Sequence, residues 1–111
     1  MVFAGCDTTI EHKTITTDEA IYMMATQDVL IVDVRTPAEF SSGHIPGAIS
    51  LELNEIRFVV NYVIPDVNQT ILVYCRSGVR SAEASAILAE MGYRNVYDFG
   101  GILSWTGEIQ Y

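Results

Sequence analysis

The stretch Ile71–Ser81, ILVYCRSGVRS, decides the fold prediction. It opens with a continuous run of aliphatic and aromatic side chains, which is typical of a strand covered on both faces in a parallel sheet. Beyond the stretch, an apolar stripe at helical spacing runs up to Gly92 and is formed by Ala84, Ile87, Leu88 and Met91. These features predict a buried strand, a short loop that begins with Cys75, and a helix that starts near Ser81.

The same alternation of strand and helix signals runs through the rest of the chain. Thr16 and Thr36 are each followed three residues later by a Glu, the pattern of a capping box at the start of a helix. We expect further strands at residues 29–33, 48–50 and 95–98, and further helices at 16–26, 36–43, 56–63 and 102–105. This order predicts an open α/β sheet with helices on both faces.

Length and composition limit the classes of function. The 111 residues fit one domain, and we expect a flexible segment over 1–13 followed by one folded domain over 14–111. Six basic against 14 acidic residues, a net charge of -8, argue against nucleic acid and anionic membranes as partners. No run of 18 apolar residues occurs, so no membrane-spanning segment is predicted. Two cysteines supply neither a disulfide framework nor a cysteine zinc site, and we expect no metal or cofactor.

The predicted site centres on Cys75, at the end of the most apolar strand. Ligands of open α/β sheets bind beyond the carboxyl ends of the strands. The first amides of a helix starting near Ser81 have no partner within the helix and, with the helix dipole, favour an anion in the preceding loop. Arg76 and Arg80 add positive charge, and Gly78 lets backbone N–H groups approach a ligand. We interpret Cys75 as an activated thiolate nucleophile, with a buried core cysteine as the alternative.

Four motifs, in one order and spacing, resemble the rhodanese family over about residues 14 to 108. They are Asp33-Val34-Arg35, Gly43-His44-Ile45-Pro46-Gly47-Ala48, Cys75-Arg76-Ser77-Gly78-Val79-Arg80-Ser81, and Gly100-Gly101 with Trp105. Each motif is weak alone, whereas the ordered set across nearly the whole chain is specific.

The resemblance implies a rhodanese-like fold, with a five-stranded, mainly parallel sheet and helices on both faces. It implies a sulfurtransferase in which Cys75 takes a sulfane sulfur from thiosulfate or a similar anionic donor, forms a persulfide, and passes the sulfur to a thiol or protein acceptor. The donor-binding loop would consist of Arg76, Ser77, Gly78, Val79, Arg80 and Ser81, with Asp33 and Arg35 as a supporting ion pair. His44 is expected to stabilise a turn, and Trp105 to pack.

Besides a redox or persulfide-reductive role coupled to another protein, which nothing in the sequence separates from sulfur donation, two other functions remain as alternatives. The first is a non-catalytic or regulatory rhodanese-like module that binds partners, which the presence of Cys75 and both arginines disfavours. The second is a phosphatase or arsenate reductase, whose loops place five residues between Cys and Arg. Here only four residues separate Cys75 from Arg80, so the loop suits a sulfur atom better than a phosphoryl group.

The location of the protein depends on the start of the chain. Phe3-Ala4-Gly5-Cys6 resembles the end of a bacterial lipoprotein signal, in which a cysteine after small residues is lipidated. An unremarkable terminal cysteine is the simpler interpretation, because chain ends are usually poorly ordered. A cytoplasmic location is therefore favoured, with an extracytoplasmic lipoprotein anchored at Cys6 as the alternative.

Overall fold

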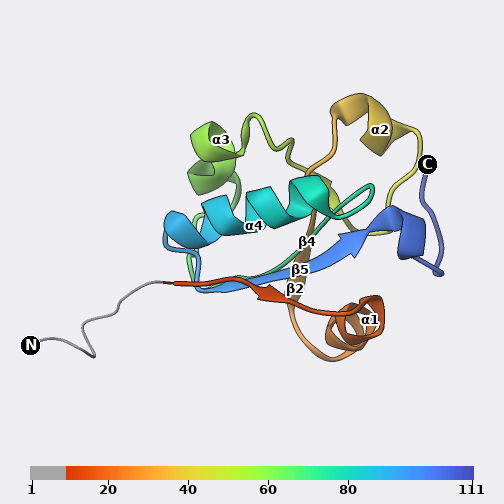
Figure 1. Ribbon diagram of the computed structural model, residues 1–111, viewed down its shortest axis with the longest axis horizontal. Coiled ribbons are helices and arrows are strands. Elements are labelled where there is room, and N and C mark those ends of the chain that lie inside the picture. Colours follow the sequence, from red (N-terminus) through yellow and green to blue (C-terminus); the bar gives the residue numbers. More distant parts are fainter. Residues whose placement is uncertain (1–9) are drawn as a thin grey trace, which may run out of the picture.

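The computed structural model describes residues 10–111, and it forms a five-stranded sheet with helices on both faces (Figure 1). The strands are β1 (Lys13–Thr14), β2 (Val29–Asp33), β3 (Ile49–Ser50), β4 (Thr70–Cys75) and β5 (Asn95–Gly101). The helices are α1 (Thr17–Thr26), α2 (Pro37–Ser41), α3 (Ile56–Val63), α4 (Val79–Glu90) and the 3-10 helix η2 (Ile102–Ser104).

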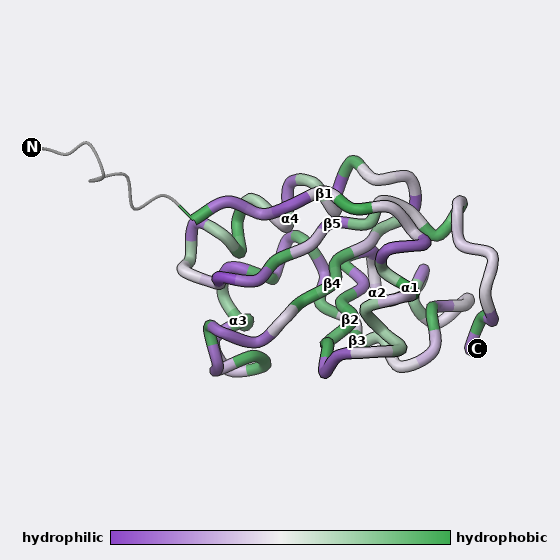
Figure 2. Tube along the Cα trace, turned by 90° about the horizontal axis from the view of Figure 1, so that it is seen from below, coloured by the Kyte–Doolittle hydropathy of each residue, from purple (hydrophilic) through white to green (hydrophobic). Residues whose placement is uncertain are grey.

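All strand pairs are parallel, and the order across the sheet is β1-β5-β4-β2-β3. β4 lies in the centre, with Val73 opposite Val32 of β2 on one side and Asp98 of β5 on the other. The register on the β5 side shifts between Val73 and Cys75, so that Cys75 lies opposite Gly101. In Figure 2 the apolar colour is concentrated along the inner strands, whereas much of β1 at the edge is hydrophilic.

Each face of the sheet has its own apolar core, because successive side chains of a strand point to opposite faces. α3 and α4 cover one face, where Val73 and Cys75 belong to a cluster that also holds Val60 and Leu88. α1 covers the other face, where the buried cluster consists of Ala20, Ile31, Ile45, Leu72, Tyr74 and Phe99. Double coverage explains why β2 and β4 read as continuous apolar runs, and it confirms the predicted fold class.

The structure differs from the predicted elements at four places. α2 ends at Ser41 and not at residue 43. α4 begins at Val79, two residues before the expected Ser81, because Gly78 turns the chain with a φ of +109° and its carbonyl accepts the first helical bond from Ala82. β5 extends to Gly101 instead of ending at Asp98. β1 was not predicted, and its Lys13 lies in the segment expected to be flexible.

The carboxyl ends of the strands form one edge of the sheet, and α2 and η2 both lie at this edge (Figure 1). Residues 10–111 contain no helix that is long and apolar enough to cross a membrane. The possible lipidation residue Cys6 lies outside the described part of the chain.

Candidate active site around Cys75

Cys75 is the last residue of β4 and lies directly before the N-terminal end of α4. Its side chain is buried, and no disulfide is formed. The two residues that follow are exposed, and Gly78 then caps the helix. The strand therefore fixes the sulfur at the edge of the sheet where the chain turns into the helix.

Backbone N–H groups surround the sulfur of Cys75. The amide of Gly78 donates a hydrogen bond to Sγ over 3.0 Å. Burial raises the pKa of Cys75, but hydrogen bonds from the side chain and amide of Ser81 and from the amides of Gly78 and Ser77 outweigh burial, so the net shift is downward. The site thus favours the thiolate, the nucleophilic form of cysteine.

The hydroxyl of Ser81 connects this loop to a buried carboxylate on β5. Ser81 Oγ lies 2.7 Å from Asp98 Oδ1, and the amide of Gly100 donates to the same oxygen over 2.9 Å. Both Ser81 and Asp98 are buried. Asp98 was not predicted as a site residue, although an acidic residue near the carboxyl end of a strand beside Cys75 was a usable signal.

Arg80 does not face the site as a free cation, since Glu39 of α2 binds its guanidinium. Nη1 and Nη2 donate to the two carboxylate oxygens over 2.7 and 2.9 Å. Glu39 also accepts the amide and hydroxyl of Thr36, which completes the capping box of α2. Arg80 is the main cause that lowers the pKa of Glu39 to about 2, so this carboxylate balances the charge of Arg80 at neutral pH. The sequence predicted Glu39 only as a helix cap.

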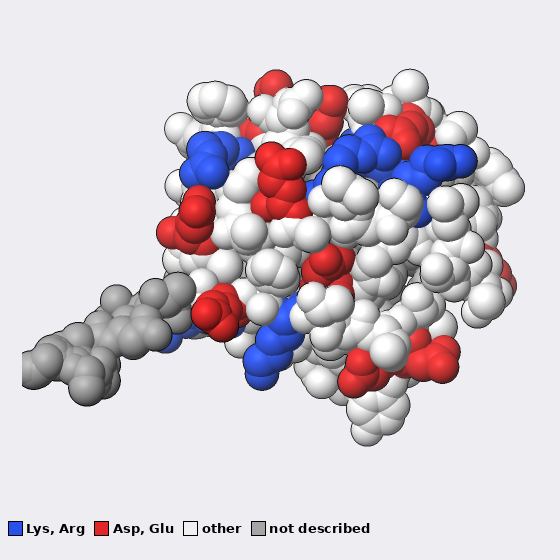
Figure 3. Space-filling view, viewed as in Figure 1, with Lys and Arg blue, Asp and Glu red and all other residues white. Residues whose placement is uncertain are grey.

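Arg76 is exposed, and its backbone ties the loop to η2. Its carbonyl oxygen accepts a hydrogen bond from the amide of Leu103 over 3.2 Å. No side chain among residues 10–111 forms a salt bridge with Arg76. On the face shown in Figure 3, basic side chains gather at the α2 end of α4, with acidic side chains beside them. Arg76 thus carries the unbalanced positive charge of the loop.

The predicted pair of Asp33 and Arg35 forms a buried salt bridge. Arg35 Nη2 lies 2.7 Å from Asp33 Oδ2, and its Nε donates to Oδ1 over 3.0 Å. Nη2 also donates to the carbonyl of Gly43 over 2.8 Å. This second contact ties the end of β2 to the segment after α2.

His44 and Trp105 make the contacts expected of structural residues. His44 stacks on Phe40 with ring centroids 3.7 Å apart, and its Nδ1 lies 2.9 Å from the carbonyl of Phe40. Trp105 packs against Phe99 and donates from Nε1 to the carbonyl of Glu108. Neither ring is bound to Cys75.

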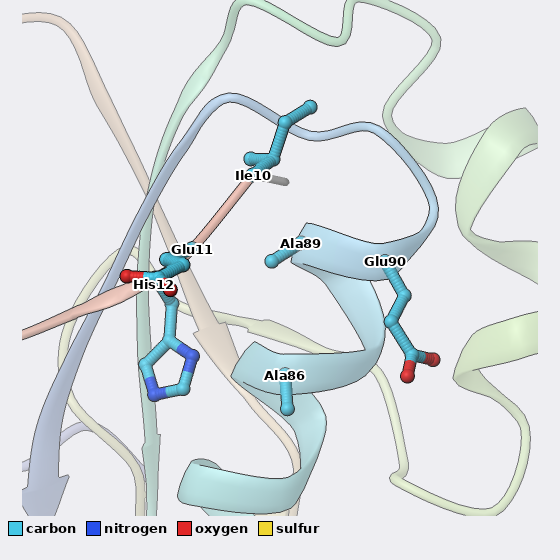
Figure 4. A pocket seen from close by; sticks show the side chains of 6 residues that line it. All are labelled: Ile10, Glu11, His12, Ala86, Ala89 and Glu90. Atoms are coloured by element: carbon cyan, nitrogen blue, oxygen red, sulfur yellow. The ribbon is translucent and has the colours of Figure 1, made fainter. Parts of the chain in front are cut away.

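A separate pocket lies between the start of the described chain and the second half of α4. It is lined by Ile10, Glu11, His12, Ala86, Ala89 and Glu90 (Figure 4). The α4 residues that line this pocket are Ala86, Ala89 and Glu90, near the end of the helix, whereas the Cys75 loop precedes the beginning of that helix. The pocket therefore does not belong to the site. Among residues 10–111, no group of three His, Cys, Asp or Glu side chains is placed to hold a metal ion.

Comparison with known proteins agrees with this geometry. The family model of the rhodanese-like domain matches residues 16–108. The chain belongs to the rhodanese family. A sulfurtransferase of Allochromatium vinosum is 43% identical over 82 residues, which cover 73% of this chain and 75% of the relative. The thiosulfate sulfurtransferase PspE of Escherichia coli is 41% identical over 71 residues, which cover 64% of this chain and 68% of the relative.

A solved structure of a rhodanese with anions from Escherichia coli shares this fold. It is 36% identical, has a TM-score of 0.68, and the match covers 73% of this chain and 95% of that one. The rhodanese resemblance seen in the sequence motifs is therefore confirmed over nearly the whole domain. The relatives of this chain include enzymes named thiosulfate sulfurtransferases, as the resemblance in the motifs implied.

Proposed function

We propose that this rhodanese is a sulfurtransferase that moves a sulfane sulfur from thiosulfate or a similar donor to a thiophilic acceptor through a persulfide on Cys75. The observation that carries the proposal is the position of Sγ, 3.0 Å from the amide of Gly78 at the start of α4. Relatives named thiosulfate sulfurtransferases support this choice of donor.

The reaction proceeds in two transfers. In the first, the Cys75 thiolate attacks the outer sulfur of thiosulfate, the sulfur–sulfur bond of the donor breaks, and its electron pair leaves with sulfite. The charge then resides on the terminal sulfur of the persulfide. In the second, a nucleophilic acceptor takes that sulfur, and the electron pair of the persulfide bond returns to Cys75 as the thiolate.

The loop stabilises negative charge in each state. The amides of Ser77, Gly78 and Ser81 already favour the thiolate, as their effect on the Cys75 pKa indicates. Fixed N–H donors cost no reorganisation during the reaction, so they serve the thiolate and the persulfide alike. We assign donor binding to the loop from Arg76 to Ser81, including Val79, which is 77% exposed.

The two arginines contribute unequally to this proposal. Arg76 has no side-chain counter-ion among residues 10–111 and is the principal attractant for an anionic donor. Arg80 shares its charge with Glu39, so its contribution is smaller than the sequence alone indicated. The thiolate also contributes to the raised pKa of Arg80, after Glu39, which is consistent with some attraction between Arg80 and the sulfur.

The test is turnover of thiosulfate with cyanide as the acceptor, read as thiocyanate and as released sulfite. We expect the wild type to form both products and Cys75→Ser to form neither, because a serine hydroxyl is not ionised at neutral pH. Cys6→Ser is the matched control and should retain full turnover. Equal turnover by folded Cys75→Ser and wild-type protein would refute the proposal.

A further inference from the structure

Asp98 is a buried acidic residue that the proposed reaction does not use. Its relative exposure is 4%, and no Lys or Arg among residues 10–111 forms a salt bridge with it. A buried carboxylate without a cation must be stabilised by hydrogen bonds. Asp98 receives two of them at Oδ1, from Ser81 Oγ and from the Gly100 amide.

The hydroxyl of Ser81 lies where it can serve two anions. Ser81 is the third residue of α4, its hydroxyl donates to Asp98, and its side chain and amide are among the groups that lower the pKa of Cys75. A hydroxyl has one proton to donate. Its oxygen lies 2.7 Å from Asp98 Oδ1, against 3.1 Å from the Gly78 carbonyl and 3.3 Å from the Gly100 carbonyl. The charged acceptor at the shortest distance forms the strongest bond.

The sheet register places Asp98 on the same face as the reactive sulfur. Asp98 pairs with Val73, which lies two residues before Cys75 on β4 and therefore points to the same side. That side is covered by α4, whose N-terminal end carries partial positive charge. Two groups that are anionic when ionised, the thiol of Cys75 and the carboxyl of Asp98, thus share one helix end.

We infer that Asp98 is a positioning residue that draws the hydroxyl proton of Ser81 away from Cys75 and so limits how readily the thiol ionises. With a neutral thiol, Ser81 donates to Asp98 and its lone pairs can accept the S–H proton. Once the thiol ionises, thiolate and carboxylate compete for the single hydroxyl proton. The inference rests on Cys75 as the reactive group of the proposed function, but no part of it requires a sulfur donor.

Two of the other charged groups near the loop are already paired and do not contact Asp98. Arg35 is paired with Asp33, and Arg80 is paired with Glu39. Arg76 is exposed and projects from the loop itself. A change at Asp98 therefore alters one unpaired charge and one hydrogen bond near the sulfur.

A limit on how readily the Cys75 thiol ionises is useful in sulfur transfer. The nucleophilicity of a thiolate falls as the pKa of its thiol falls, and the most effective attacking thiol has a pKa near the ambient pH. Three amides and a hydroxyl stabilise the Cys75 thiolate. Asp98 offsets part of that stabilisation and keeps the sulfur reactive.

The test is the pH dependence of Cys75 alkylation by iodoacetamide, with Cys6→Ser present in every protein so that a single thiol reacts. Asp98→Asn keeps the shape and a carbonyl acceptor but removes the charge. We expect its midpoint to shift to lower pH, with about three- to tenfold faster alkylation below the wild-type midpoint, which corresponds to the net free energy of one ordinary hydrogen bond. Asp18→Asn, at the exposed start of α1, is the matched control and should leave the midpoint unchanged.

A double-mutant cycle with Ser81→Ala identifies the route of the effect. We expect Asp98→Asn to shift the midpoint less when Ser81 is absent, because the freed hydroxyl proton is then missing. An unshifted midpoint in folded Asp98→Asn, or fully additive shifts in the double variant, would overturn the inference. Neither result depends on turnover, so both are distinguishable from a failure of the proposed sulfur transfer.

A wild-type measurement covers the case in which Asp98→Asn does not fold. The side-chain carbon of Asp98 can be followed by NMR across the pH range in which Cys75 ionises. We expect its resonance to move at the midpoint of Cys75, because the two groups share the Ser81 proton. A resonance that stays constant through that midpoint would overturn the inference.

Discussion

Gly101→Ala should displace the Cys75 loop, because Gly101 packs directly on the backbone of that loop. A Cβ at position 101 would lie 2.6 Å from the carbonyl carbon of Arg76 and 2.7 Å from Cα of Ser77, and it would overlap the Arg76 carbonyl oxygen. All three are backbone atoms. No side-chain rotation relieves the overlap, so the loop itself must move.

The required movement can be read from the distances. Ordinary van der Waals contact begins at 3.4 Å, so the Arg76 carbonyl carbon at 2.6 Å must move by at least about 0.8 Å, and its oxygen, which is nearer, must move farther. Overpacking of this kind costs about 1–3 kcal/mol of stability. A misplacement of about 1 Å in a catalytic group costs on the order of 100-fold in rate. We therefore expect Gly101→Ala to lose about 100-fold in thiosulfate turnover while most of the protein stays folded.

The assay combines turnover, iodoacetamide alkylation of Cys75 and urea unfolding on the same samples. Gly92→Ala is the matched control. Gly92 has a φ of +100°, but a Cβ added there would meet no atom within 4 Å, and the residue lies at the far end of α4. It should lose about 1 kcal/mol of stability from backbone strain and keep its turnover per folded molecule. Turnover of folded Gly101→Ala within twofold of wild type would refute the packing argument.

Three further substitutions test the charged groups around the site. Arg80→Ala should lower turnover and raise the pH at which Cys75 alkylates, and unchanged values of both would contradict its role in the loop. Glu39→Gln should cost about 1 kcal/mol at pH 7 in urea unfolding, and this difference should vanish as the pH falls through 2. The sign follows because the pKa of Glu39 is lowered from 4.5 to about 2, so its contribution is present above 4.5 and is lost as the pH falls toward 2. If the difference in unfolding free energy between wild type and Glu39→Gln did not change with pH, the ion pair with Arg80 would not be the source of that difference. Arg35→Ala leaves Asp33 buried without its cation and should cost about 3–5 kcal/mol, and a loss below 1 kcal/mol would contradict the buried pair.

The parts of the fold that local sequence determines were predicted well. β2 and β4 are continuous apolar runs because both of their faces are covered, and burial of this kind is visible in the sequence itself. The capping boxes at Thr16 and Thr36 join residues three apart, so they too can be read locally, and both are present. The position of Cys75 between strand and helix follows from these signals.

The features that the sequence did not reveal depend on contacts between distant residues. Glu39 and Arg80 are 41 positions apart, and only the fold brings α2 against α4. Ser81 and Asp98 meet because β5 lies beside β4, which chain order alone does not specify. β1 is two exposed residues long and is held by backbone pairing with β5, so it leaves no apolar pattern.

The persulfide on Cys75 is tested most directly by mass spectrometry of the protein after incubation with thiosulfate and removal of excess donor. The peptide that contains Cys75 should gain the mass of one sulfur atom, and cyanide or a reducing thiol should remove it. Cys75→Ser should show no adduct, whereas Cys6→Ser should show the same adduct as the wild type. A sulfur adduct on the Cys6 peptide alone, or turnover by folded Cys75→Ser, would contradict Cys75 as the sulfur carrier.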